Sequence, residues 1–198
     1  MTERLPRIAV LVSGGGTNLQ ALIDAAARGR LGVEITVVVS DRPGTRAAER
    51  AAAAGIYTVV LDRKSLGGEL SEAILEAIGT DLDLVVLAGF LSRVTHPLLS
   101  AYEGRIINIH PALLPSFGGH GMYGRRVHEA VIAAGAEETG CTVHYVDEGM
   151  DTGKVVLQKR MEVRPDDTPD TLAQRLRPLE HEALIEAVEA LTKGEPVT

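Results

Sequence analysis

Asn108 and His110 are the residues of this chain best placed to do chemistry, because they stand two positions apart in a β-branched run. Residues 105–110 predict a buried strand that stops at Pro111. Alternate side chains of a strand share a face, so the amide and the imidazole point the same way. An amide that donates to an oxyanion beside an imidazole that relays a proton suits acyl or one-carbon transfer. The alternative is that both side chains only cap the strand end.

Asp151 lies in a glycine-flanked acidic turn and is the carboxylate that we expect beside His110, where it would fix the tautomer and favour the protonated ring. No nucleophile accompanies this trio. No serine lies in a G-x-S-x-G elbow, and Cys141 has no supporting motif. The sequence therefore favours direct attack by a substrate amine over a covalent intermediate.

The other histidines carry weaker signals. His144 lies on a strand and fits the core or the wall of a site equally well, whereas His120 lies in the long loop 111–124 and could reach the site. The remaining three are expected to be structural or surface residues: His96, His128 and His181. No pair has the spacing of zinc ligands, so we expect no metal.

A glycine-rich turn at residues 13–18 separates an apolar strand from a helix and offers backbone N–H groups to a phosphate. Gly16, Thr17 and Asn18 are the candidate phosphate ligands. The turn fits neither G-x-G-x-x-G, because Leu19 replaces the third glycine, nor the P-loop ending. The alternative is a tight turn that uses glycine for its backbone freedom.

Glu180 lies at the edge of the apolar stripe of a C-terminal helix that begins after Thr168. Its carboxylate either lines a site or reaches past the stripe to solvent. We expect Pro178 to kink this helix or to start a new turn.

Strands and helices alternate along the chain and predict an α/β, Rossmann-like domain with an open, mostly parallel sheet and helices on both faces. The expected strands are residues 8–12, 33–40, 57–61, 84–88, 105–110, 141–146 (alternating) and 155–163. The expected helices are residues 19–29, 47–54, 70–78, a segment ending near 134, and 169–191. Residues 62–65 are expected to form a polar loop, and His96-Pro97 a short turn.

Composition narrows the class of protein. With 198 residues the chain suits one domain, with two conceivable. The net charge of -7 and the 3% of aromatic residues argue against nucleic-acid binding. Cys141 is the single cysteine, which excludes an internal disulfide and favours a reducing compartment. With no apolar core of a signal peptide and no membrane-length apolar run, we expect a cytoplasmic protein that does not bind membranes.

Four segments together resemble one family, the folate-dependent phosphoribosylglycinamide formyltransferases of purine biosynthesis. They are S-G-G-G-T-N-L-Q at 13–20, V-L-A-G-F at 86–90, N-I-H-P-A-L-L-P at 108–115, and G-C-T-V-H-Y-V at 140–146 with M-D-T-G at 150–153. The N-I-H-P-x-L-L-P segment is shared by folate formyltransferases generally, and the first segment is more specific to the purine enzyme. The resemblance runs from Arg7 to about Leu191 and implies a single formyltransferase domain over 1–198. Its phosphate-binding half would be about 1–100, and its folate-binding and catalytic half about 101–198.

The resemblance also implies roles for residues. The glycinamide ribonucleotide amine would attack the formyl carbon of 10-formyltetrahydrofolate, the co-substrate. We expect the protein to be a monomer or a homodimer. The implied catalytic residues are Asn108, His110 and Asp151, and the implied ribonucleotide contacts are Gly16, Thr17, Asn18 and Glu180. The implied folate contacts are Leu91, Ser92, Arg93 and Val94, with Asn108, Asp147, Glu148, Gly149 and Met150, and Arg63 or Lys64 near the folate tail.

Two departures from the family pattern fall in the expected site. The chain has Gly89-Phe90-Leu91-Ser92 where G-F-M-R is usual, with Arg93 one place late. It also has Phe117-Gly118-Gly119 where F-P-G is usual in the long loop.

Other functions remain as alternatives. Methionyl-tRNA formyltransferase and formyltetrahydrofolate hydrolase carry additional domains, which we do not expect to fit in 198 residues. A non-catalytic nucleotide-binding protein built on residues 13–18 would not need Asn108, His110 and Asp151 together. A nicotinamide oxidoreductase is disfavoured because the glycine fingerprint fails.

Overall fold

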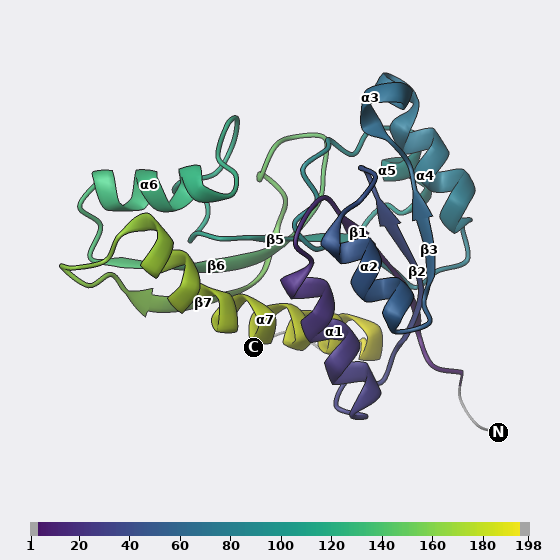
Figure 1. The fold of residues 1–198 in the computed structure, drawn as a ribbon, viewed down its shortest axis with the longest axis horizontal. Helices are drawn as coiled ribbons and strands as arrows, with labels where there is room; N and C mark the ends of the chain where they lie inside the picture. The colour runs from purple at the N-terminus through teal and green to yellow at the C-terminus, as the bar shows by residue number, and fades with distance from the viewer. Residues whose placement is uncertain (1–3, 195–198) are drawn as a thin grey trace.

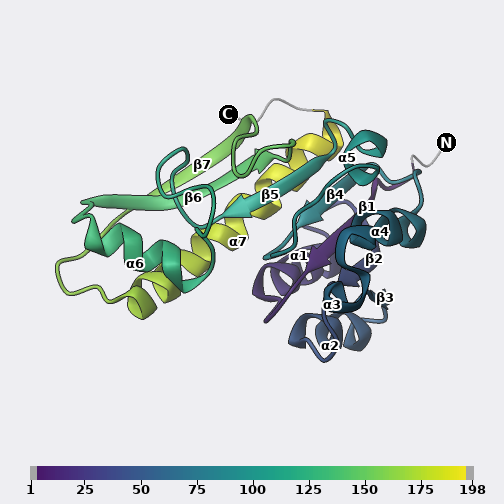
Figure 2. The same ribbon diagram turned by 90° about the horizontal axis from the view of Figure 1, so that it is seen from above.

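The computed structural model describes residues 4–194 and has at its centre a seven-stranded sheet in the order β3-β2-β1-β4-β5-β6-β7 (Figures 1 and 2). The strands are β1 Arg7–Val12, β2 Glu34–Ser40, β3 Tyr57–Val60, β4 Leu84–Leu87, β5 Ile106–His110, β6 Glu138–Tyr145 and β7 Val155–Glu162. The strands from β3 to β5 pair in parallel, and β6 and β7 are added antiparallel. The predicted open, mostly parallel sheet is confirmed.

Helices cover both faces of the sheet. They are α1 Thr17–Ala27, α2 Arg46–Ala53, α3 Arg63–Leu66, α4 Leu70–Ile78, α5 Leu98–Ala101, α6 Arg125–Ala133 and α7 Pro169–Lys193. Helices α1, α2 and α7 bury apolar side chains against one face, and α4 and α5 against the other. In the described part of the chain, no helix is long and apolar enough to cross a membrane.

Strand β5 lies where the parallel part of the sheet meets the antiparallel part. Figures 1 and 2 show β6, β7 and α6 extending away from the block of β1 to β4 and its helices, while α7 runs along both parts. Strand β5 pairs with β4 on one side and with β6 on the other. Its carboxyl end therefore opens into the space between the two parts, which is where open α/β sheets place their ligands.

Residues 62–65 do not form a loop, contrary to prediction. The side chain of Asp62 accepts a hydrogen bond from the backbone of Lys64 at 3.1 Å and caps the short helix α3. A second short helix, α5, follows Pro97 where only a turn was expected. Both helices are single turns, which are too short to give a periodic apolar pattern.

Strand β6 was predicted to alternate between buried and exposed side chains, and this prediction is wrong. Six consecutive residues of the strand are buried. Helix α7 covers one of its faces. The segment after β5 covers the other, where Thr142 Oγ1 donates to the Ala112 carbonyl at 2.7 Å and accepts from the Leu114 backbone at 3.0 Å. Helix α7 runs through Pro178 as one element and does not restart there.

Candidate active site

Asn108 and His144 face each other across strands β5 and β6, where they are direct cross-strand partners. Nδ1 of His144 lies 2.8 Å from the Tyr145 carbonyl, which can only accept, so Nδ1 carries a hydrogen. Burial lowers the pKa of His144, so the ring is neutral and Nε2 is an acceptor. Nδ2 of Asn108 lies 3.1 Å from this Nε2 and donates to it. The amide orientation is thereby fixed, and its second Nδ2 hydrogen stays available to a ligand.

His110 is buried at the end of the same strand, and each of its ring nitrogens has a neighbour. Nε2 donates to the Phe117 carbonyl at 2.8 Å, and Nδ1 lies 3.6 Å from Oδ2 of Asp151. The expected contact between His110 and Asp151 is present. The loop that follows β5 thus folds back over the imidazole and shields it from solvent.

Asp151 lies between two histidines, since its Oδ1 is 3.6 Å from Nε2 of His144. It has a positive φ of 57°, which is rare for a residue other than glycine. Its Oδ2 also accepts the backbone N–H of Gly119 at 2.9 Å, which ties it to the loop 111–124. Packing and this bond hold Asp151 in the strained conformation.

The turn before Asp151 is held by its own contacts. Asp147 accepts hydrogen bonds from the Gly149 backbone at 2.9 Å and from the Thr152 hydroxyl at 2.7 Å. A Cβ atom at Gly153 would lie 1.8 Å from the Tyr145 carbonyl oxygen, so only glycine allows the turn to close onto β6. The sequence D-E-G-M-D-T-G therefore places the Asp151 carboxylate at the end of β6.

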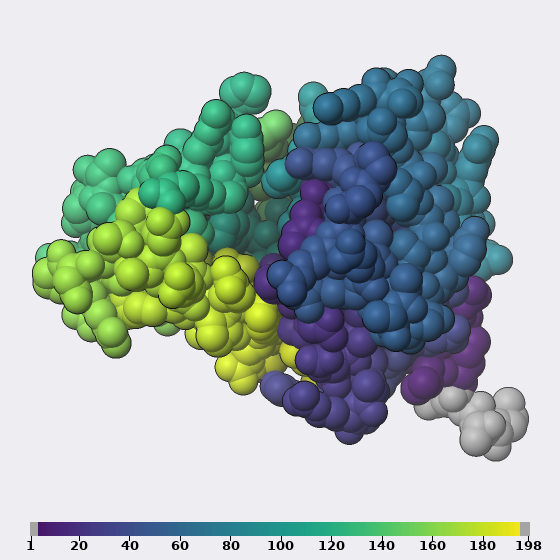
Figure 3. Space-filling model, in the orientation of Figure 1, coloured from purple at the N-terminus to yellow at the C-terminus, as the bar shows by residue number. Residues whose placement is uncertain are grey.

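These groups line a cleft of about 670 Å³. Figure 3 shows the surface hollowed between the teal and green part over α6 and the purple and blue part over α1 and α2. Twelve of the predicted site residues line it: Asn18, Leu91, Ser92, Arg93, Val94, Asn108, His110, Asp147, Gly149, Met150, Asp151 and Glu180. Five do not: Gly16, Thr17, Arg63, Lys64 and Glu148.

Gly16 fixes the shape of the glycine-rich turn before α1. Its φ is +69°, and a Cβ atom there would lie 2.7 Å from both Cα and Cβ of Ala47 on α2. Within residues 4–194, no side chain makes a capping hydrogen bond to α1. The first backbone N–H groups of a helix have no partner within it, so the turn presents free donors as an anion site requires.

Asn18 and Glu180 join the start of α1 to α7. Nδ2 of Asn18 donates to Oε2 of Glu180 at 3.2 Å, and both residues line the cleft. Burial raises the pKa of Glu180, while the hydrogen bond from Asn18 and the charge of Arg177 oppose this effect. Of the two alternatives for Glu180, the structure selects the wall of the cleft.

The two segments predicted to contact folate both line the cleft and touch at its rim. The guanidinium of Arg93 donates to the Glu148 carbonyl at 2.7 Å, and Oε1 of Glu148 lies 3.0 Å from Nε2 of His96. The backbone of Leu91 donates to the Ser13 hydroxyl at 2.7 Å, which attaches this wall to the glycine-rich turn.

Arg63 and Lys64 lie behind this wall on α3. Nη1 of Arg63 donates to the buried Asp41 at 3.3 Å, and Ser92 on the cleft wall donates to the same Asp41 oxygen at 2.5 Å. Among the described residues, Arg63 is linked to the cleft through Asp41, and Lys64 is exposed. Their predicted contact with the folate tail stays a prediction.

The sequence analysis did not assign several residues that line the cleft, or left their roles undecided. His144 and His120 line the cleft, and so does His128, which was expected to be structural or on the surface. Burial lowers the pKa of His128. At the mouth, the Arg126 guanidinium carbon lies 5.1 Å from the ring centre of Tyr123. Only the antiparallel pairing of β5 with β6 reveals His144, and a single sequence carries no signal of that register.

Comparisons with known proteins agree with this geometry. Residues 6–188 match the model of the formyl transferase family. The chain belongs to the formyl transferase family. Within it, the chain is 37% identical to glycinamide ribonucleotide transformylase 1 from Symbiobacterium toebii over 96% of this chain and 89% of that one, with a TM-score of 0.88. The corresponding Geobacillus kaustophilus structure is 41% identical over 96% and 100% of the two chains, with a TM-score of 0.87.

Two curated relatives are longer than this chain. The chain is 40% identical over 96% of its length to the chloroplastic phosphoribosylglycinamide formyltransferase of Vigna unguiculata, of which it spans 62%. It is 39% identical over 98% of its length to the Drosophila melanogaster trifunctional purine biosynthetic protein adenosine-3, of which it spans 14%. The formyl transferase family includes chains that carry this fold as one part of a larger protein.

Proposed function

We propose that this chain transfers the formyl group of 10-formyltetrahydrofolate to the amine of glycinamide ribonucleotide. The observation that carries the proposal is that one cleft contains both the Asn18–Glu180 pair beside the glycine-rich turn and the cluster of Asn108, His110 and Asp151. A ribonucleotide anchored at the turn would extend its amine toward that cluster. The names of the similar solved structures support the same substrate.

The ribonucleotide site consists of the turn and the pair behind it. The free N–H groups at the start of α1 suit a phosphate ester. The Glu180 carboxylate, oriented by Asn18, is an acceptor for ribose hydroxyl groups. Gly16, Thr17, Asn18 and Glu180 are therefore the proposed ribonucleotide contacts.

The proposed folate site is the part of the cleft formed by the segments after β4 and after β6. Phe90, Val94 and Val146 line this part of the cleft together with Asp147 and residues 149–151. Apolar side chains beside polar groups suit a flat heterocycle with hydrogen-bonding edges. We assign Leu91, Ser92, Arg93 and Val94, together with Asp147, Gly149 and Met150, to this contact. The co-substrate supplies the formyl group in an activated form.

The reaction forms a bond between the amine nitrogen and the formyl carbon and breaks the bond from that carbon to the folate nitrogen, which takes up the proton that the amine loses. Asn108 donates its free Nδ2 hydrogen to the oxygen that becomes negative. A protonated His110 ring stabilises the same charge electrostatically, and Asp151 holds that ring in place. Asp151 orients His110 and is the nearest carboxylate for holding the proton in transit.

A spectrophotometric assay of folate turnover, with and without glycinamide ribonucleotide, tests the proposal. Turnover that requires the ribonucleotide is the expected result. Turnover without it would identify a hydrolase instead. No turnover with the ribonucleotide still bound would leave the nucleotide-binding alternative.

A further inference from the structure

His128 on α6 is a buried polar residue of the cleft that has no part in the reaction proposed above. It is 5% exposed and lines the cleft, and its Nδ1 is buried without a hydrogen-bond partner among the described residues. Buried polar side chains are usually satisfied within the protein. One that opens onto a ligand cleft without a partner therefore indicates a group that is still to be bound.

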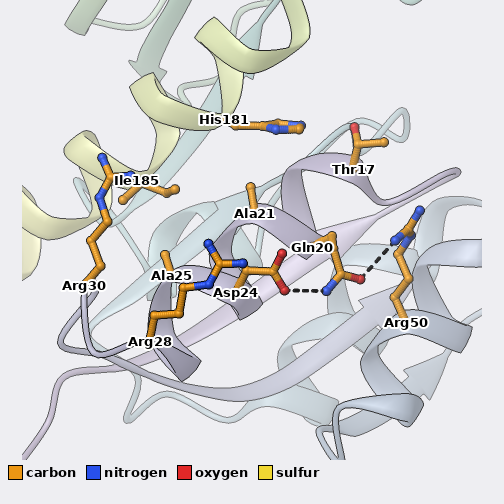
Figure 4. A pocket seen from close by; sticks show the side chains of 10 residues that line it. All are labelled: Thr17, Gln20, Ala21, Asp24, Ala25, Arg28, Arg30, Arg50, His181 and Ile185. Carbon is orange, nitrogen blue, oxygen red and sulfur yellow. Dashed lines mark hydrogen bonds between the residues drawn. The ribbon is translucent and has the colours of Figure 1, made fainter.

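A second histidine has the same feature but lies elsewhere. Nε2 of His181 is buried and has no partner within residues 4–194, and His181 lines a cavity of about 340 Å³ between α1 and α7 (Figure 4). None of the described residues lines both this cavity and the cleft. In the described part of the chain, His128 is thus the histidine whose partnerless ring nitrogen belongs to the cleft.

The sequence of α6 places the ring of His128 and holds it there. Val127 and Val131 are four residues apart and fully buried, and His128 is buried beside them on the same helix. Arg125 pairs with Asp170 in the first turn of α7, which ties the two helices together. A side chain on a helix that is fixed in this way is held more precisely than one on a loop.

The ring of His128 is neutral and offers one donor to the cleft. Burial lowers its pKa, and the charge of His110 lowers it further, while Asp170 opposes both effects. A neutral imidazole carries one donor and one acceptor. An N–H group without an acceptor is rarer in protein interiors than an acceptor without a donor, so the hydrogen belongs on Nε2 and not on the buried Nδ1.

Helix α6 faces the part of the cleft that we assign to the ribonucleotide. Figure 3 shows the surface hollowed between the part over α6 and the part over α1 and α2, and the glycine-rich turn lies at the start of α1. The proposed folate segments instead follow β4 and β6. The charge of His110 acts on His128, so the ring lies toward the end of the cleft where the glycinamide group would meet His110.

We propose that His128 is a substrate contact that donates a hydrogen bond from Nε2 to the carbonyl oxygen of the glycinamide group. The inference rests on the proposed function, because it needs the ribonucleotide in the cleft. A site built to bond a polar group of its substrate discriminates strongly against analogues that lack the group, since its own polar atom is then left unpaired. His128 therefore makes the site selective for the glycinamide group over a bare sugar phosphate.

Isothermal titration calorimetry of the whole chain with glycinamide ribonucleotide, ribose 5-phosphate and tetrahydrofolate tests the proposal. His128→Leu removes the donor and should weaken binding of the ribonucleotide about tenfold. The same variant should bind ribose 5-phosphate and tetrahydrofolate as wild type does, because neither carries the glycinamide group. His128→Gln keeps an N–H donor and should retain most of the affinity for the ribonucleotide.

Thermal unfolding separates this role from a structural one. Leucine fills the volume of the ring and removes the partnerless Nδ1, so the Tm of His128→Leu should stay the same or rise while the affinity falls. Glu129→Gln is the matched control, because Glu129 follows on the same helix and pairs with Arg125 at the surface. It should change neither the affinity nor the Tm appreciably.

Equal affinities of wild type and His128→Leu for glycinamide ribonucleotide would overturn the proposal. A loss of affinity that extends equally to all three ligands, together with a lower Tm, would also overturn it, because it would show a distorted cleft. A wild type that binds no glycinamide ribonucleotide would overturn the proposed function as well, so the two failures are distinguishable.

Discussion

Asn18 donates a 3.2 Å hydrogen bond to Glu180, and this bond joins the first turn of α1 to the middle of α7. The two residues are 162 positions apart in the chain. Both residues line the cleft, and the hydrogen bond favours the charged form of a carboxylate whose ionisation burial disfavours.

Glu180→Gln is expected to stabilise the fold while weakening the proposed ribonucleotide binding. Burial raises the pKa of Glu180, so its ionised form costs stability as the pH rises through the pKa of the folded state. The amide removes this cost at neutral pH, and each kcal/mol gained should raise the Tm by about 2–4 °C. Thermal unfolding at several pH values measures this effect. The gain should disappear as the pH falls below about 4.3, the ordinary pKa of an exposed glutamate.

If the gain in Tm were the same at pH 4 and pH 7, the charge of Glu180 would not be its cause. Glu182→Gln provides the control, because Glu182 lies two residues further along α7 and pairs only at the surface. It should change the Tm little at any pH.

Asn108→Ala, His110→Ala and Asp151→Asn are expected to abolish most turnover and leave the fold intact. Each removes a donor or a charge near the reacting oxygen, and loss of one such donor typically lowers kcat by a factor of about 100 or more. The folate assay gives the rates, and circular dichroism checks the fold. Rates equal to wild type in all three variants would contradict the proposed mechanism.

Gly16→Ala is expected to destabilise the protein by about 2–4 kcal/mol, because the added Cβ meets a positive φ and the α2 backbone together. Denaturant unfolding measures the change. Gly14→Ala is the matched control, since a Cβ there meets nothing within 4 Å. Comparable losses in the two variants would contradict the proposed close approach of the turn to α2.

Acid should weaken the fold below about pH 6.5, the ordinary pKa of histidine. Burial lowers the pKa of His128, His144 and His181 in the folded state. As the pH falls, these three side chains are therefore protonated in the unfolded chain before they are protonated in the folded one. Each such proton lowers the free energy of unfolding by up to about 1.4 kcal/mol per pH unit until the folded state also binds it.

Unfolding free energies of wild type and of His144→Gln between pH 5 and 7 check this effect. The variant should show a shallower decline. His96→Gln serves as the control because His96 is exposed. An identical slope in wild type and His144→Gln would rule out His144 as a contributor.

The sequence by itself determined the order of the main elements and the fold class. The long apolar runs of β1, β2 and β4 and the i, i+4 stripes of α1 and α7 are set by local periodicity, which a single chain displays directly. The contact of His110 with Asp151 was also predictable, because a strand end and an acidic turn each carry their own local signals. Short elements such as α3 and α5 were not predictable, because one turn gives no period.

Only the tertiary structure decided which residues meet from distant parts of the chain. The antiparallel register of β5 and β6 brings His144 opposite Asn108, and a shift of one residue would have placed it on the other face. The packing of α7 against α1 places Glu180 in the cleft. The attachment of α3 to the residue that follows β2 turns Arg63 toward the buried Asp41. Register and helix packing are set by the sum of many contacts across the core, so no local stretch of sequence specifies them.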